Sequence, residues 1–375
     1  MTDTPTRRTP VAESQRQHPD DAFTFDEVRL AARNHAMPLE ALRYPLTPAG
    51  LHYLLIHYDI PDLDAAAWRL EIDGAVERRL TLSLEDLKRR PAVTAPVTLE
   101  CAGNGRALYV PHPVSQPWIT EGIGTAAWTG APLAPILDEA GIAPAAIEVL
   151  FTGADLGVEG GEVQHYARAL PRVEALLPGV LLAYAMNGEP IPPQHGFPVR
   201  LLVPGWYGMT HVKWLRRITA LAQPYTGYQN AHVYRMRTRE DDPGTPVTRM
   251  VPRSLMEPPG IPDFATRDRV VAPGDCELRG RAWSGWGPIT RVEVSTDGGQ
   301  HWHPAALGDA LADYAWRPWT YLWHAEPGSH DLCSRATDAT GRAQPMRALW
   351  NLGGYMNNSV QHLVVVVAAE QTASA

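Results

Sequence analysis

The stretch Pro96-Val-Thr-Leu-Glu-Cys-Ala-Gly-Asn-Gly-Arg106 joins an apolar, strand-like run to a glycine-rich loop, and Cys101 lies alone at the junction. Glycines at positions 103 and 105 would let a bulky group approach the backbone, so we expect the Cys101 thiol at the lip of a cavity. Arg106 follows closely, and a nearby cation favours the thiolate, the form that binds metals. An isolated cysteine is more often a small buried hydrophobe, so its neighbours must decide between the two interpretations.

The length indicates two domains, or one elaborate domain with an appendage. The chain has 375 residues, which exceeds the size that a single hydrophobic core usually supports. Hydrophobic residues at 45% and charged residues at 20% are ordinary for a soluble globular protein, and no apolar run approaches the ~20 residues of a membrane span. A net charge of -8 argues against a nucleic-acid partner, because phosphate binding normally requires a basic face.

Three cysteines, Cys101, Cys276 and Cys333, are too few for a disulfide framework. The alternation of apolar residues places Cys276 on an inner face and Cys333 on an outer one, which disfavours a bridge between them. Arg7 and Arg8 are not followed by an apolar segment, so we expect no export signal. A reducing compartment fits these features, and the cytoplasm is the default expectation.

The pattern along the chain predicts three regions: a loose tail over 1–21, a first domain over 22–245 and a second domain over 246–375. The first domain alternates short strand-like runs with helix-like segments at 84–90 and 133–140, which is typical of an α+β domain. A proline-rich connection marks the boundary. Beyond it, period-2 strands and turn signals predict an all-β, immunoglobulin-like sandwich.

Further segments of the first domain carry polar residues in contexts that folding alone would not require. The candidate ligand-binding side chains are His35, Asp155, His195, Arg200, His211 and Lys213. The cationic and imidazole groups could donate to a phosphate, and the carboxylate could accept from a pterin-like ring edge. Each signal is weak alone, since His-Gly-Phe-Pro at 195–198 is more often a structural turn.

Together these segments resemble the sulfite oxidase family of molybdenum-pterin enzymes, from about Arg33 to Asn357-Asn358. The motifs that carry the resemblance are Leu99-Glu-Cys-Ala-Gly-Asn-Gly-Arg, His195-Gly-Phe-Pro-Val-Arg and Val212-Lys-Trp-Leu. The resemblance implies a molybdopterin-binding catalytic domain followed by an immunoglobulin-like dimerisation domain, and therefore a homodimer. It also implies that Cys101 is the thiolate ligand of molybdenum and that the cofactor is bound by Asn34, His35, Asp155, His195, Arg200, His211, Val212 and Lys213.

The same resemblance implies a substrate pocket. Arg33 and Arg106 match two arginines that bind the anion, Trp118 matches a pocket tryptophan, and Tyr234 matches the tyrosine beside the molybdenum. Without the resemblance, Tyr234 could equally be a boundary aromatic that packs on the second domain. Members that act on sulfite commonly carry arginine after Trp-Asn-Leu, where this chain has Gly353. Losing one hydrogen bond to a charged group, ~1.5–3 kcal/mol, means roughly ten- to a hundredfold weaker anion binding.

The leading hypothesis is a molybdenum-dependent oxidoreductase that transfers an oxygen atom, with sulfite as the small anionic substrate. No counterpart of the family's haem domain and no Cys-x-x-Cys-His occur, so we expect no haem and a separate electron acceptor such as a cytochrome. A second hypothesis is a reductase of an S- or N-oxide with the same cofactor, and a remote one is a cofactor-free binding or adhesion protein. A zinc enzyme is disfavoured, because His52 and His57 lack the spacing of a zinc-binding helix pair.

Overall fold

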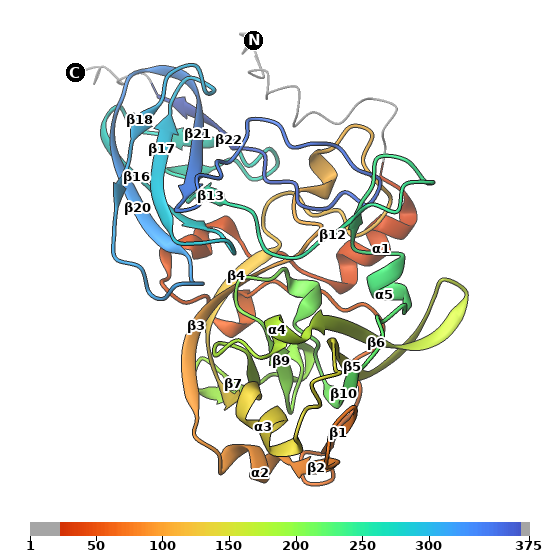
Figure 1. Ribbon diagram of the computed structural model, residues 1–375. Coiled ribbons are helices and arrows are strands. Elements are labelled where there is room, and N and C mark those ends of the chain that lie inside the picture. Colours follow the sequence, from red (N-terminus) through yellow and green to blue (C-terminus); the bar gives the residue numbers. More distant parts are fainter. Residues whose placement is uncertain (1–22, 369–375) are drawn as a thin grey trace, which may run out of the picture.

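The chain folds into two strand-rich domains (Figure 1), and the computed structural model describes residues 23–368. The predicted tail over 1–21 lies outside the described residues. In Figure 1 the first domain, coloured red to green, occupies the lower part of the view, and the second domain, cyan to blue, lies above it. Among the described residues no helix is both long and apolar enough to cross a lipid bilayer.

The first domain contains two five-stranded sheets. The first has the order β2-β1-β10-β5-β6, in which β1 runs parallel to β10 and the other neighbours are antiparallel. Its strands are β1 (Arg69–Gly74), β2 (Leu80–Ser83), β5 (Glu148–Glu159), β6 (Glu162–Pro171) and β10 (Leu215–Leu221). The second sheet is antiparallel and comprises β3 (Val93–Glu100), β4 (Ile123–Pro132), β7 (Leu181–Met186), β8 (Glu189–Pro190) and β9 (Arg200–Leu202).

The helices of this domain are short. The α-helices are α1 (Phe25–Arg33), α2 (Leu84–Lys88), α3 (Leu133–Ala140), α4 (Arg172–Ala175) and α5 (Tyr228–Ala231). The 3-10 helices are η2 (Leu39–Arg43), η3 (Ala49–Leu51), η4 (Arg106–Leu108), η5 (Pro193–His195) and η6 (Gly208–Thr210). The mixed α+β character predicted for this domain is confirmed.

Local sequence explains where the two predicted helices begin and end. At α2, the Ser83 hydroxyl accepts from the Asp86 backbone N–H and the Asp86 carboxylate accepts from the Ser83 backbone N–H, which forms a capping box. At the end of α3, Gly141 adopts a φ of 69°, the left-handed conformation that closes many helices. The predicted helix at 133–140 is confirmed, with its sheet-facing side chains buried. The helix predicted at 84–90 is present but ends at Lys88.

One hydrophobic core holds the two sheets of the first domain together. It joins apolar side chains of both sheets with the inner face of α3, and its fully buried members include Leu70, Ile72, Ile136, Phe151, Leu170, Leu182, Leu201 and Ile218. The strands therefore have fixed positions, so that the loops at their ends can hold functional side chains in defined geometry.

The second domain is a sandwich of two sheets with the orders β13-β16-β20-β19 and β14-β15-β22-β21-β17-β18. The first comprises β13 (Arg253–Met256), β16 (Gly274–Trp283), β19 (Ala306–Leu307) and β20 (Arg317–Ala325). The second comprises β14 (Ile261–Pro262), β15 (Arg269–Val271), β17 (Ile289–Ser295), β18 (His303–Pro304), β21 (Gly328–Asp338) and β22 (Gln361–Val367). Between the domains lies the small pair β11 (Arg235–Met236) and β12 (Thr245–Pro246).

The core of the sandwich confirms the predicted immunoglobulin-like architecture. Side chains from both sheets meet in one cluster that includes Leu278, Val292, Trp319, Leu332 and Val365. Cys276 packs against this cluster, as predicted, and Cys101, Cys276 and Cys333 are free thiols. The predicted boundary at 245/246 stays a prediction, although β13 already pairs with the sandwich strand β16.

Candidate cofactor site

A cavity opens in the first domain beside Cys101. It encloses about 630 Å³ of space, a figure that includes open solvent at its mouth. The lining residues used below are His52, Tyr53, Leu55, His57, Cys101, Asp155, Tyr166, His195, Arg200, His211, Lys213, Trp214 and Tyr234. They come from the segment before β1, from the strand ends of both sheets and from the connection to the second domain.

The loop after β3 holds Cys101 in a tight turn. The Cys101 backbone N–H donates to the Gly122 carbonyl at 2.8 Å, and the Cys101 carbonyl accepts from the Asn104 backbone N–H at 2.9 Å. Position 103 requires glycine, because the Arg106 guanidinium packs against it and a Cβ there would lie only 2.5 Å from Arg106 Nη2. Gly105 has a φ of 91°, which favours glycine. The glycines thus allow the turn and the close approach of Arg106.

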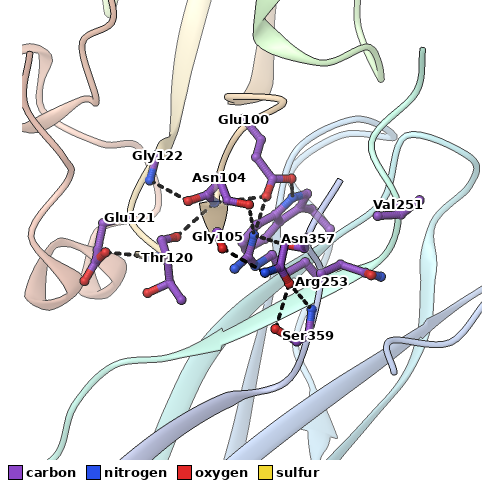
Figure 2. A network of polar contacts seen from close by, with 12 residues as sticks. Glu100, Asn104, Gly105, Thr120, Glu121, Gly122, Val251, Arg253, Asn357 and Ser359 are labelled. Carbon is purple, nitrogen blue, oxygen red and sulfur yellow. Dashed lines mark hydrogen bonds and ion pairs between the residues drawn. The ribbon is translucent and has the colours of Figure 1, made fainter. Parts of the chain in front are cut away.

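A buried polar network anchors this loop to the second domain (Figure 2). Arg253 Nη1 donates to Glu100 Oε1 and to the Asn357 carbonyl, each at 2.9 Å. Asn104 Nδ2 donates to Glu100 Oε1 at 3.0 Å, and Asn357 Nδ2 donates to the Gly105 carbonyl at 2.8 Å. Residues of the sandwich domain therefore bond directly to the segment that carries Cys101.

The protonation of Cys101 differs from the sequence-based expectation. Burial raises the pKa of this thiol, and the opposing effect of Arg106 is smaller. The expected thiolate is therefore wrong for the protein by itself, because the cost of burying the charge exceeds the attraction of one guanidinium. A bound metal ion would reverse this balance, since a coordinating thiol is deprotonated outright.

One wall of the cavity carries buried cations without a carboxylate partner within hydrogen-bonding reach. Arg200 donates to the carbonyls of His195 and His211, and Lys213 Nζ donates to the carbonyls of Leu55 and Gln194. Burial, reinforced by the neighbouring Arg200, lowers the pKa of Lys213 to about 7. Uncompensated buried cations are costly, so this wall fits an anionic ligand.

Unpartnered polar atoms on the cavity wall indicate the same type of ligand. Asp155 Oδ1, His195 Nε2 and His52 Nε2 are buried and have no hydrogen-bond partner within residues 23–368. His211 differs, because its Nδ1 accepts from the Val203 N–H and its Nε2 bonds to the Trp206 carbonyl. The residues present thus fit a bound group that combines negative charge with hydrogen-bonding ring edges, as the resemblance implies.

Another part of the cavity lining is an aromatic and histidine cluster. The Tyr234 hydroxyl lies 2.6 Å from His57 Nε2, and the His57 ring stacks on Tyr166 with centroids 4.7 Å apart. Burial lowers the pKa of His57 to about 3, so the imidazole is neutral. Burial also raises the pKa of Tyr234 well above its usual value, so the phenol keeps its proton. The Arg168 guanidinium covers the Tyr234 ring at 5.3 Å.

The segment Arg33-Asn34-His35 lies outside the cavity lining. Arg33 is exposed and donates to the Tyr58 carbonyl at 2.6 Å, while His35 forms a backbone bridge with Leu54. Asn34 Oδ1 accepts from the Ile56 N–H at 2.8 Å. This segment therefore hydrogen-bonds to the backbone at 54–58, which contributes residues to the cavity lining. The roles that the resemblance implies for its side chains stay predictions.

Three further predicted residues are buried but do not line the cavity. Val212 is part of the hydrophobic core. Trp118 packs in the same apolar cluster as Cys101. Arg106 is buried, donates to the Gly353 and Gln116 carbonyls, and covers the Tyr355 ring at 5.3 Å. The remaining predicted residues, Cys101, Asp155, His195, Arg200, His211, Lys213 and Tyr234, are brought together around the cavity.

Sequence reasoning missed several lining residues: His52, Tyr53, Leu55, His57 and Tyr166. A signal for two of them was present, because His52 and His57 interrupt an otherwise apolar run at 51–58. Their spacing disfavours a zinc pair, but it does not exclude that they line a cavity. Tyr166 and Arg168 lie on β6, and nothing in the local sequence marks them as functional. Their place at the site depends on which residues from distant parts of the chain pack against this strand.

Comparison with known protein families identifies both halves of the chain. Residues 57–229 match the oxidoreductase molybdopterin binding domain, and residues 264–368 match the Mo-co oxidoreductase dimerisation domain. Individual relatives agree. The chain is 34% identical over 388 residues to the mitochondrial sulfite oxidase of Macaca fascicularis, covering 96% of this chain and 69% of that protein. It is 34% identical over 343 residues to NADH nitrate reductase 1 of Oryza sativa subsp. japonica, covering 84% of this chain.

The relatives are longer than the chain, which spans only 37% of that nitrate reductase. Among solved structures, the sulfane dehydrogenase SoxCD from Paracoccus pantotrophus is similar, with a TM-score of 0.77 and 26% identity. The similarity covers 97% of this chain and 96% of that one. The arrangement of the two domains is therefore shared over nearly the whole length.

Proposed function

Because the chain belongs to the sulfite oxidase and nitrate reductase family of molybdopterin oxidoreductases, we propose that it oxidises sulfite to sulfate. The observation that carries this proposal is the convergence of Cys101, a cationic wall and the Tyr234–His57 pair on one cavity. A thiol, an anion-binding wall and a buried proton carrier are what oxygen-atom transfer to a small anion at a metal centre requires.

We propose that Arg200, Lys213 and His195 bind the anionic part of the molybdenum cofactor and that Asp155 accepts from its ring edge. Cys101 would hold the metal as a thiolate. When bound, the cofactor supplies a metal centre that exchanges one oxygen atom and two electrons with the substrate. The protein residues position this group, shield it from water and carry protons.

Tyr234 and His57 would act on the substrate side. Because His57 is neutral, its Nε2 can accept the Tyr234 hydroxyl hydrogen bond at 2.6 Å when the imidazole proton lies on Nδ1. The phenol oxygen then keeps a lone pair for a bond from water. Through the same contact His57 could act as a base: Tyr234 would pass its proton to His57 Nε2 while taking one from the water, which leaves the phenol neutral and His57 as a transient imidazolium.

A second candidate is the reduction of an S- or N-oxide. It is favoured by the surroundings of Gly353, where a Cβ would lie only 2.2 Å from Tyr355 Cε2. Tyr355 also packs on Tyr234 with ring centroids 5.3 Å apart. An aromatic ring thus borders the position at which the resemblance implies an arginine in members that act on sulfite, and an aromatic neighbour suits a neutral oxide better than an anion.

Several consequences belong to the same proposal. We propose that electrons pass to a separate acceptor such as a cytochrome and that the matched dimerisation domain forms a homodimer. The three free thiols support a reducing compartment, for which we propose the cytoplasm. Analytical ultracentrifugation and cell fractionation test the last two points.

Steady-state assays test the substrate. The purified enzyme is assayed with sulfite and an oxidising dye, and separately with a sulfoxide and a reduced dye, while molybdenum is quantified in the same preparation. Sulfite-dependent dye reduction by molybdenum-containing enzyme is expected. Oxide-dependent dye oxidation with no sulfite activity would replace the first candidate by the second. The Cys101→Ser variant should lose activity, and Cys276→Ser is its control; a fully active Cys101→Ser enzyme would contradict the assigned role.

A further inference from the structure

The outer face of the second domain carries a cluster of metal-ligating side chains that the cofactor cavity does not use. Asp331 and Cys333 lie two positions apart on β21, so their side chains share a face, and His362 on β22 is the register partner of Cys333. Cys333 Sγ lies 3.3 Å from His362 Nδ1 and 3.9 Å from Asp331 Oδ1. The same Nδ1 lies 2.8 Å from Asp331 Oδ2.

The geometry distinguishes a metal site from a catalytic relay. In a relay, the nucleophile and the carboxylate contact opposite nitrogens of the imidazole. Here, Cys333 and Asp331 both contact Nδ1 of His362, and the three ligand atoms lie within 4.8 Å of one another. A tetrahedral zinc ion with bonds of about 2.3 Å to sulfur and 2.0–2.1 Å to nitrogen or oxygen places its ligand atoms roughly 3.3–3.6 Å apart. The Cys333 Sγ–His362 Nδ1 separation of 3.3 Å lies in this range. Asp331 Oδ2 is closer to Nδ1, at 2.8 Å, and the other carboxylate oxygen, Oδ1, lies 3.9 Å from Sγ.

The cluster is rigid and still has a route to solvent. Cys333 is 1% exposed and the His362 side chain 4%, whereas the Asp331 side chain is 26% exposed. A turn at 297–299 closes over the carboxylate: the Gly298 N–H donates to the Asp331 carbonyl at 2.9 Å, and a Cβ at Gly298 would lie 3.1 Å from Asp331 Oδ2. Two ligands on paired strands and one ligand near the surface allow an ion to enter a preformed site.

The charges in the cluster suit a divalent cation. Burial, followed by the nearby carboxylates of Asp331 and Asp297, raises the pKa of Cys333, so the thiol stays protonated when no cation is bound. A bound divalent ion would displace the thiol proton to solvent and bind the imidazole in its neutral form. The thiolate and the carboxylate would then balance the two positive charges of the ion.

We propose that Asp331, Cys333 and His362 form a second metal site, with three protein ligands and one open position for water. The combination of sulfur, nitrogen and oxygen ligands favours zinc, whereas magnesium and calcium prefer oxygen alone. The site lies on the sandwich domain and shares no residue with the cavity beside Cys101. Three protein ligands with an open position leave the ion accessible to an additional small ligand or a side chain of a partner.

Cobalt titration of the intact, cofactor-loaded enzyme tests this site. The enzyme is freed of zinc by a chelator and titrated with Co²⁺, and difference absorption is recorded against the unloaded enzyme. We expect saturable binding of one Co²⁺ per chain with a thiolate-to-cobalt charge-transfer band, and displacement of the cobalt by zinc. No saturable binding by the wild-type enzyme would overturn the proposal.

Variants locate the bound ion. Cys333→Ser should abolish the charge-transfer band, while the matched control Cys276→Ser, a half-buried thiol of the same domain, should keep it. His362→Gln and Asp331→Asn keep the thiol and should weaken Co²⁺ binding by at least about tenfold, the scale seen when a metal's supporting groups are removed. Unchanged molybdenum content and near-ultraviolet circular dichroism verify folding. A band that persists in Cys333→Ser, or unchanged affinity in both other variants, would overturn the proposal.

Discussion

Glu100 and Arg253 form a fully buried ion pair at 2.9 Å that joins the two domains directly beside Cys101. Trp283 of the sandwich completes the contact, because its indole N–H donates to the second Glu100 oxygen at 2.8 Å. The loop that carries the candidate metal-binding thiol is therefore held from both domains. A disturbance in the second domain can reach Cys101 through this contact.

Arg253→Met should destabilise the protein strongly. The variant leaves the Glu100 carboxylate buried without its cation, which typically costs about 3–5 kcal/mol. Urea denaturation measures the free energy of unfolding. The control is Arg335→Met, which removes the more exposed pair with Glu293 and should cost no more than about 1 kcal/mol. An equal decrease in the free energy of unfolding in the two variants would show that the buried Glu100–Arg253 pair stabilises the protein no more than a partly exposed pair does.

Tyr234→Phe should lower kcat and leave folding intact. The variant removes the hydroxyl that bonds to His57 but keeps the ring that packs on Tyr355. If this hydroxyl takes part in proton transfer, a loss of about 10²- to 10⁴-fold in kcat is expected. Steady-state kinetics with the substrate identified above measures the loss. Tyr184→Phe, which removes a hydroxyl outside the cavity lining, serves as the control; similar kcat values for both variants would remove Tyr234 from the reaction.

The cofactor-free protein should lose stability in acid because of its buried histidines. Burial lowers the pKa of His52 from 6.5 to about 4. Below pH 6.5 the unfolded chain binds a proton at His52 that the folded protein does not accept until about pH 4. The stabilising effect is thus fully present above the unfolded pKa and is lost as the pH falls, by about 1.4 kcal/mol per pH unit for this one group.

His52→Gln isolates this contribution. Its unfolding free energy is measured by urea denaturation between pH 6.5 and 4. With falling pH it should decrease less steeply than that of the wild type, and the two slopes should differ by about 1.4 kcal/mol per pH unit. His324→Gln is the control, since the His324 side chain is 72% exposed. Parallel pH profiles for wild type and His52→Gln would contradict the expected titration.

Gly353→Ala should be destabilising although it adds only one methyl group. The new Cβ would lie 2.2 Å from the Tyr355 ring, which is held between Arg106 and Tyr234. Forced repacking of this kind typically costs about 1–3 kcal/mol. Gly50→Ala is the matched control, because no atom outside its immediate chain neighbours lies within 4 Å of a Cβ there. Thermal unfolding of both variants checks the difference, and a neutral Gly353→Ala would mean that Tyr355 moves freely.

Local sequence patterns predicted the architecture well. Period-2 strands with turn signals predicted the sandwich, and helix-like segments alternating with strand-like runs predicted α2 and α3, because hydrophobic periodicity acts over a few residues. The segment Arg33-Asn34-His35 shows where such reasoning ends. The resemblance implies cofactor or substrate roles for its side chains, which stay predictions; the structure adds that the segment bonds to the backbone at 54–58, a contact that local sequence does not reveal.

The amino-acid sequence by itself determined the order of the two domains and the strand-to-loop junction at Cys101. Only the tertiary structure decided which side chains share the cavity: His57 and Tyr234, 177 positions apart, meet across it. The cluster of Asp331, Cys333 and His362 likewise depends on the register of β21 against β22. The physical reason is that periodicity and capping act between chain neighbours, whereas the direction of a side chain across a cavity is set by the packing of distant strands.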